Sequence, residues 1–415
     1  MSDASENEAA AKSPEELTEA DVTGLRLLKP VRKLFAALRD CAAHPNRRLH
    51  FDEYAMGLVL YFFNPVLTSL RGLQRATEFE KVRKTLGLRR MSLGSMSESV
   101  RVFDPELLAE VFRALAAKAK THPVDPPVKE LRQVLTAVDG TVLPALPRMT
   151  WALWLGDKRR GAKAHVQLDV LKDAPVEASL TVGNASEIEE LRRSLQPGRL
   201  YVADRGYRSL DLLQDIVNAD SSFVMRWHEN LVCETIEELE PTEEAREAGV
   251  TRDRIVRLGG PKIRHKLACP VRLVEVRVAE SEPRGLGYPR TRVSSKKTFR
   301  KRPGEAYTMN LVTDRLDLPA DTIATMYRYR WKVELFFRVL KGVFCCRHLL
   351  SDSLEGVTIQ LYAALIATLL LGEYTGLKPN KRAYELVAMY LQGWVSDAEF
   401  REHLDRLRKG ASKKS

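Results

Sequence analysis

Cysteine is scarce in this chain of 415 residues, which contains only five. They lie at Cys41, Cys233, Cys269, Cys345 and Cys346, and no two of them have CxxC spacing. An odd number of cysteines without that spacing disfavours both a disulfide framework and a zinc site. We therefore expect reduced thiols.

Long apolar runs and export signals are also lacking. The longest run, Leu361–Gly372, is well short of the ~20 residues that a membrane span needs, and Gln360 and Glu373 bracket it. We interpret it as a buried helix. The first residues, MSDASENEAAAKSPEE, are acidic and small and do not resemble a secretory signal. These features predict a protein of a bacterial-type cytoplasm or of a nucleus, with no membrane partner.

Positive charge, by contrast, is abundant. The formal net charge is +11 and the sequence pI is about 9.4, which favours a polyanionic partner such as nucleic acid or a membrane surface, and charge alone does not choose between the two. The chain is too long for one small domain. We expect an acidic disordered leader at 1–20, a helical region with DNA contacts at 21–122, an α/β domain at 123–350 with an inserted subdomain at 228–306, and a helical region with a loose basic tail at 351–415.

Short apolar runs in the α/β region predict strands. LRQVLTAVDG ends in Asp139-Gly140 and LYVAD ends at Asp204, while AKAHVQLDVL and PVEASLTVG form a predicted hairpin. The extended runs followed by alternating strands and helices predict a mixed sheet with helices on its faces. Each strand-end aspartate alone has a simpler interpretation as a turn residue.

One carboxylate stands among basic residues in YRYRWKVELFFRVLKG, residues 327–342. On one helix at about 100° per residue, four polar side chains share a stripe, with Arg338 beside it. These four are Tyr327, Arg330, Glu334 and Lys341. Leu335 falls on the opposite, apolar half, which we expect to pack on a sheet. The alternative is a solvated helix face on which Glu334 only pairs with a neighbouring arginine.

Three acids gathered from separate segments suit metal-assisted phosphoryl transfer. Two divalent ions about 4 Å apart can activate the attacking oxygen and stabilise the leaving oxygen of a phosphodiester. Carboxylate oxygens are hard ligands, so Mg²⁺ is favoured and Mn²⁺ is a substitute. Asp139, Asp204 and Glu334 are the candidate catalytic and metal-binding residues.

Three motifs together resemble a known family. AVDGT at 137–141, YVADRGY at 201–207 and the spacing Y-x2-R-x3-E-x6-K are similar to insertion-sequence transposases of the Asp-Asp-Glu class, in particular to the insertion-sequence-four family with its Tyr-Arg-Glu-Lys signature. The separations support this, since 204 − 139 = 65 and 334 − 204 = 130. The second separation leaves room for an inserted, β-rich subdomain before the helix of Glu334.

The resemblance implies a ribonuclease-H-like core and a cut-and-paste DNA transposase. Its three acids would bind two Mg²⁺ ions per active site, and its partners would be terminal inverted repeats and target DNA, bound by a homodimer on paired ends. Such a protein is nucleoid-associated when bound to DNA. The signature helix would contact the DNA backbone through Tyr327, Arg330, Arg338 and Lys341.

Other features leave alternatives open. The basic stretch around Arg300, Lys301 and Arg302 is a hypothetical phosphate-binding arm or a solvated loop. Asp314 also ends a predicted strand and is the main competing acid. At the level of function, the alternatives are a non-catalytic element-derived DNA-binding protein, a transposition inhibitor, and a ribonuclease-H-like nuclease of repair or recombination.

Overall fold

Two compact units make up the chain. The computed structural model describes residues 13–41, 46–144, 149–152, 161–263, 266–278, 307–343 and 349–412. The described residues of 1–123, 140–185 and 332–415 form unit 1, and those of 124–139 and 186–331 form unit 2. This grouping differs from the linear division expected from the sequence, because the N-terminal and C-terminal helices belong to the same unit.

Unit 2 is built on seven strands in the order β1-β4-β5-β9-β8-β7-β6. Its elements are α6 (Pro126–Lys129), the first half of β1 (Val134–Pro144), α7 (Glu187–Arg193), β4 (Arg199–Ala203), the 3₁₀ turn η5 (Arg205–Tyr207), α8 (Leu210–Asn218), β5 (Ser222–Trp227), β6 (Cys233–Leu239), α9 (Glu243–Glu247), β7 (Val250–Leu258), β8 (Val271–Val278), β9 (Tyr307–Thr313) and α10 (Ala320–Arg328).

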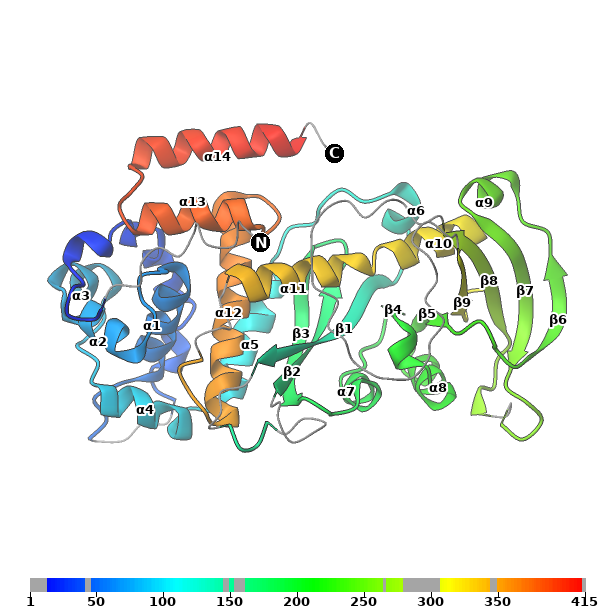
Figure 1. Cartoon of the computed structure of the whole chain (residues 1–415), viewed down its shortest axis with the longest axis horizontal. Helices are drawn as coiled ribbons and strands as arrows, with labels where there is room; N and C mark the ends of the chain where they lie inside the picture. Colours follow the sequence, from blue (N-terminus) through cyan, green and yellow to red (C-terminus); the bar gives the residue numbers. More distant parts are fainter. Residues whose placement is uncertain are drawn as a thin grey trace, which may run out of the picture. The chain divides into compact units, whose positions relative to one another are not determined.

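The strands of unit 2 are parallel on one side and antiparallel on the other. β1 pairs parallel with β4 and β4 with β5, while β5, β9, β8, β7 and β6 follow one another antiparallel. The green strands β6, β7 and β8 in Figure 1 arise from the sequence between 228 and 306. The expectation of a mixed sheet with a β-rich stretch before the helix of Glu334 is therefore confirmed.

The two faces of the β4 and β5 strands differ in character. Tyr201, Ala203, Phe223 and Met225 pack with the buried leucines of α8 in one core. Side chains alternate between the faces of a strand. The intervening residues of both strands therefore face the other way, and α10 packs on this sheet as well.

Unit 1 is mainly helical. It contains the short 3₁₀ helices η1 (Glu19–Asp21), η2 (Leu25–Leu27), η3 (Lys29–Lys33) and η4 (Ala36–Leu38), then α1 (Phe51–Phe63), α2 (Leu70–Glu78), α3 (Glu80–Leu86), α4 (Leu93–Val102), α5 (Pro105–Ala117), the hairpin strands β2 (Gly161–Asp169) and β3 (Ala174–Val182), and α11 (Trp331–Val343), α12 (Leu354–Thr375), α13 (Lys381–Leu391) and α14 (Asp397–Ser412).

Helix α12 is the centre of unit 1. It is the one helix, among the described residues, that is long and apolar enough to cross a membrane, and 83% of its most apolar window is buried. α12 packs against α1, α5 and β3, and Figure 1 shows it beside the cyan α5. Tyr362 donates a hydrogen bond of 2.9 Å to the Ala178 carbonyl on β3. The prediction of a buried helix is confirmed.

Three local expectations are wrong. Leu17 is buried and Asp21 accepts hydrogen bonds from Thr18, so the chain from Ser13 is part of unit 1 rather than a disordered leader. α14 continues through Lys409 to Ser412, helped by an ion pair between Glu402 and Arg406, so this part of the basic tail is helical. β1 does not end at Asp139 but runs on to Pro144.

The β2–β3 hairpin is confirmed, and it contains a buried histidine. His165 lies 7% exposed, with its Nε2 atom 2.8 Å from the Thr181 hydroxyl. Four residues along the same strand, Asp169 accepts hydrogen bonds from the backbone of Leu171 and Lys172 at the turn. These partners support a structural role for this polar face.

His165 makes stability depend on pH. Burial, with a contribution from Lys163, lowers its pKa from 6.5 to about 4. Because the unfolded chain then binds the proton more readily, the native state loses stability as pH falls from about 6.5 toward 4, by about 2 kcal/mol at pH 4.5. We expect His165→Gln to reduce this loss, measured by urea unfolding at pH 7 and pH 4.5. The exposed His403 provides the control, and an equal response of His403→Gln would contradict the assignment.

Candidate active site

Asp139 on β1 and Asp204 directly after β4 each lie two residues beyond the last paired residues of two adjacent parallel strands. The register pairs Val134 with Arg199 and continues to Ala137 with Val202, a constant offset of 65 residues. Continued over two residues, it pairs 139 with 139 + 65 = 204. Residues in register on neighbouring strands point to the same face. The two carboxylates therefore share the face of unit 2 opposite to the Tyr201 and Phe223 core.

Asp204 caps the turn that follows β4. Its Oδ1 atom accepts a hydrogen bond of 2.7 Å from the Arg205 backbone. The hydroxyl of Tyr327 on α10 is 3.5 Å from the same oxygen. Tyr327 is 6% exposed, and this burial, with Asp204 adding to it, raises its pKa to about 12. Tyr327 thus stays protonated, so its hydroxyl can donate to the carboxylate at neutral pH.

Asp139 faces an arginine from the segment after α10. The Arg330 guanidinium lies 3.7 Å from the Asp139 Oδ2 atom and 5.8 Å from the centre of the Tyr327 ring. On the same strand, Val138 faces the core together with Tyr207. Burial, then the charges of Glu187 and Asp139, raise the pKa of the Tyr207 hydroxyl. The negative charge of Asp139 therefore acts on two neighbouring groups, the Arg330 guanidinium and the Tyr207 hydroxyl.

Arg226 lies beside Asp204, and the sequence reasoning did not single it out. The register between β4 and β5 pairs Ala203 with Met225, so the next step pairs Asp204 with Arg226. The Arg226 guanidinium is 3.9 Å from Asp204 Oδ1 and lies 5.6 Å from the centre of the Tyr307 ring. The only available signal was an arginine at the end of the apolar run SFVM. Asp139, Asp204 and Arg226 form one row across three parallel strands.

The signature residues do not share one helix, contrary to the expectation. α10 ends at Arg328 and α11 begins at Trp331, with three-residue backbone hydrogen bonds at Tyr329 and Arg330 between them. Tyr327 thus belongs to α10 and Arg330 to the break, while Glu334, Arg338 and Lys341 lie on α11 in unit 1. The constant rotation of 100° per residue does not hold across such a break.

Within α11, the predicted apolar half is buried only in part. Val333, Phe336 and Leu340 are buried, whereas Leu335 is 44% exposed and Trp331 is 47% exposed. Glu334, Arg338 and Lys341 are all partly exposed. The expectation that Leu335 packs with the buried half is wrong.

The competing candidates have structural partners. Asp314 accepts a 2.9 Å hydrogen bond from the Phe223 backbone, and burial raises its pKa. Trp227 packs against the core of unit 2. Arg300, Lys301 and Arg302 lie outside the described residues, as do Cys345 and Cys346.

The carboxylates fit a hard cation in their chemistry. Side chains of Asp139 and Asp204 are 24% and 38% exposed, and their neighbouring guanidiniums lie beyond hydrogen-bond distance. Such oxygen donors suit Mg²⁺ or Mn²⁺. In the part of the chain that the structure describes, no three His, Cys, Asp or Glu side chains are grouped closely enough to hold a metal ion. Asp139 and Asp204 thus offer two carboxylates within unit 2 whose chemistry suits a hard cation.

Comparisons with known proteins agree on one family. The family model described as Transposase DDE domain matches residues 130–370, more than half of the chain. A protein of Sinorhizobium fredii (strain NBRC 101917 / NGR234) named as a candidate transposase, y4zB, is 29% identical over 245 residues, covering 59% of this chain and 61% of that protein. A Geobacillus stearothermophilus protein named as a probable transposase for insertion sequence element IS5377 is 26% identical over 238 residues, covering 57% of this chain and 55% of that protein.

The matches have limits in length and in structure. The chain spans 61% and 55% of the lengths of these two relatives. A cryo-EM structure titled as a piggyBac transposase synaptic complex with hairpin DNA covers 94% of this chain and 84% of its own, with a TM-score of 0.41 and 12% identity. That likeness is too weak to support an argument about the site.

Proposed function

The chain belongs to the transposase DDE domain family, and from this premise we propose that it is a cut-and-paste DNA transposase. The reaction would be metal-dependent strand cleavage at insertion-sequence ends followed by strand transfer into target DNA. The observation that carries the proposal is the row of Asp139, Asp204 and Arg226, with Tyr327 and Arg330 against its two acids. A strand-spanning row of acids bordered by cations suits phosphodiester chemistry.

Each residue of this row has a proposed role. Asp139 and Asp204, together with Glu334, are the proposed metal ligands. The guanidiniums of Arg226 and Arg330 offset the repulsion between the paired carboxylates and an approaching phosphate. Tyr327 donates toward Asp204 and fixes the orientation of that carboxylate. Direct contact of Tyr327, Arg330, Arg338 and Lys341 with the transposon end remains a prediction.

The proposed cofactor is two Mg²⁺ ions per active site, with Mn²⁺ as a substitute. When bound, the ions would supply Lewis-acid activation of the attacking and leaving oxygens. The aligned carboxylates contribute two ligands from unit 2, and the family pattern assigns the third to Glu334. We further propose a ribonuclease-H-like core, membership of the insertion-sequence-four branch, and a homodimer on paired ends.

A cleavage assay tests the function and its need for metal. We expect the purified chain to cleave duplex DNA that carries its terminal inverted repeats in the presence of Mg²⁺ or Mn²⁺, and to bind without cutting in excess EDTA. The reason is that uncompensated carboxylates repel the phosphate whose attack they must assist. Metal-independent cleavage would contradict the mechanism. Binding without cleavage under every metal condition would favour an element-derived DNA-binding protein or inhibitor.

A further inference from the structure

A hollow in unit 1 is bordered by charged side chains that form no ion pair with the residues that the structure describes. It has a volume of about 260 Å³ and lies between the segment 46–49 and the helix α4. Arg47, Arg48 and Glu98 line it, and within the described ranges none of the three takes part in an ion pair. Neighbouring arginines behave differently, since Arg39 pairs with Asp52 and Arg89 with Glu53.

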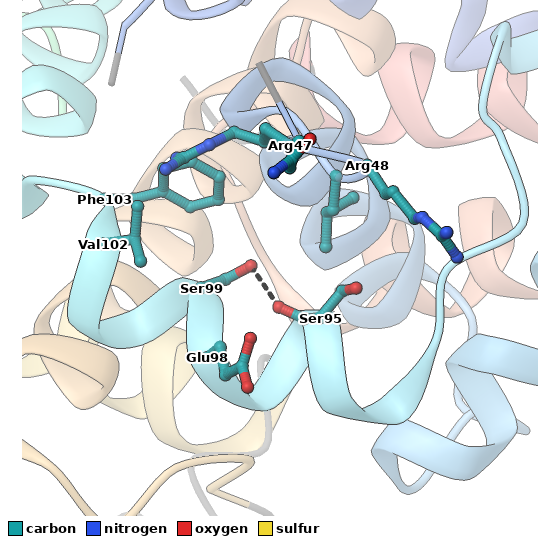
Figure 2. Close-up of a pocket in the computed structure, with 9 residues that line it drawn as sticks. Arg47, Arg48, Ser95, Glu98, Ser99, Val102 and Phe103 are labelled. Atoms are coloured by element: carbon teal, nitrogen blue, oxygen red, sulfur yellow. Dashed lines mark hydrogen bonds between the residues drawn. The ribbon is translucent and has the colours of Figure 1, made fainter. Parts of the chain in front are cut away.

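Arg47 is held in place by stacking rather than by a carboxylate. Its guanidinium lies 5.5 Å from the centre of the Phe103 ring. The two side chains are drawn next to each other in Figure 2. Phe51 also packs on that ring, stacked at 4.5 Å with an interplanar angle of 5°. Cation–π contact with a buried aromatic fixes the guanidinium plane and leaves its hydrogen-bond donors for another group. A positively charged group is thereby pre-organised at the border of the hollow.

The remaining walls suit a nucleotide better than a bare anion. In Figure 2, Arg48 extends in a different direction from Arg47, while Ser95, Glu98 and Ser99 border the hollow from α4. Val102 is 40% exposed and adds apolar surface. The Ser99 hydroxyl is already used in a 2.7 Å hydrogen bond to the Ser95 carbonyl. The positive charges therefore border a space that also has apolar contact area and a carboxylate acceptor.

We propose that this hollow binds one nucleotide of a DNA strand, with Arg47 and Arg48 on its two flanking phosphates. The inference rests on the proposed function, because it takes DNA to be the substrate. It adds a DNA-binding site on unit 1 that is separate from the row of acids in unit 2. Guanidiniums bind phosphates through several donors, and the apolar side chain of Val102 suits the deoxyribose. Glu98 keeps further phosphates out of the space between.

Salt-dependent binding tests the site in the full chain. The probe is a fluorescein-labelled duplex with the terminal inverted repeat, followed by anisotropy without metal from 50 to 300 mM NaCl. We expect the double variant Arg47→Ala/Arg48→Ala to bind at least about tenfold more weakly at low salt, with the slope of log K against log[salt] reduced by about 2. Glu98→Gln should tighten binding, because it removes a negative charge near phosphates.

The control removes the same charge elsewhere. Arg382 and Arg401 are exposed on α13 and α14 and do not line the hollow, so Arg382→Ala/Arg401→Ala should bind DNA almost as the wild type does. Equal losses in both double variants would overturn the site in favour of a general charge effect. The site would also be overturned if Arg47→Ala/Arg48→Ala bound DNA with the affinity of the wild type and with the same slope of log K against log[salt].

The proposed function fails by a different result. Suppose that the wild type binds DNA but never cleaves it, and that Arg47→Ala/Arg48→Ala weakens this binding. The nucleotide site is then supported and the transposase activity is not.

Discussion

Asp204→Asn is expected to lower the rate of DNA cleavage by at least about 1000-fold while leaving DNA binding within a few-fold of the wild type. Asparagine keeps the size and one acceptor oxygen, so the hydrogen bond from the Arg205 backbone can persist. The change removes the negative charge that a hard cation requires. It also removes a charge that repels DNA, so binding has no reason to weaken. The measurement is single-turnover cleavage with Mg²⁺, alongside binding without metal.

Asp139→Asn and Glu334→Gln should show the same pattern. Losses of residues that act as one unit are not additive, so a double variant is expected to be little slower than a single one. Asp314→Asn is the matched control, because Asp314 also follows a strand but caps the Phe223 backbone. It should cleave at close to the wild-type rate. Intact cleavage by Glu334→Gln would remove that residue from the proposed site.

Breaking the ion pair between Arg272 and Asp253 should have the largest effect on stability. The two side chains are 9% and 2% exposed on β8 and β7, with the Arg272 Nε atom 2.8 Å from Asp253 Oδ1. Arg272 also donates to the carbonyls of Leu316 and Leu318, in the segment that leads into α10. Removing one partner leaves a buried charge uncompensated, which costs about 3–5 kcal/mol. Asp253→Ala and Arg272→Ala should each reach this range.

The pairing can be separated from general damage. Arg272→Met/Asp253→Leu should be less destabilising than either single variant, because it removes both charges together. The exposed pair of Arg252 and Glu238 serves as the control, and Arg252→Ala should cost no more than about 1 kcal/mol. Urea unfolding gives the free energy, and hydrogen exchange in β7 and β8 assigns the loss to unit 2. If the double variant lost more free energy of unfolding than the two single variants together, a dominant effect of the uncompensated charge would be contradicted.

This ion pair also connects stability to the site. The segment that Arg272 holds leads directly into α10, and α10 carries Tyr327 against Asp204. The β-rich stretch between 228 and 306 therefore supports the position of Tyr327 beside Asp204.

The sequence predicted the strands well because a short apolar run can adopt few structures other than a buried strand. SFVMRW and YTMNLVT became β5 and β9, and the hairpin formed around the expected turn. The two strand-associated aspartates were found for the same reason, as acids after runs that must be buried. The prediction that Tyr327, Arg330, Glu334 and Lys341 share one helix was wrong because the helix breaks at Tyr329 and Arg330. Such a break depends on what the chain packs against, and the hydrophobic period of the sequence does not encode the break.

By itself the sequence determined the transposase family, since the motifs that carry the resemblance are properties of the chain before it folds. Only the tertiary structure decided that the strands before Asp139 and Asp204 pair in parallel, that Arg226 lies beside Asp204, and that Tyr327 and Arg330 reach one acid each. Register and helix docking arise from pairing and packing between segments far apart in the chain, and no local pattern contains that information.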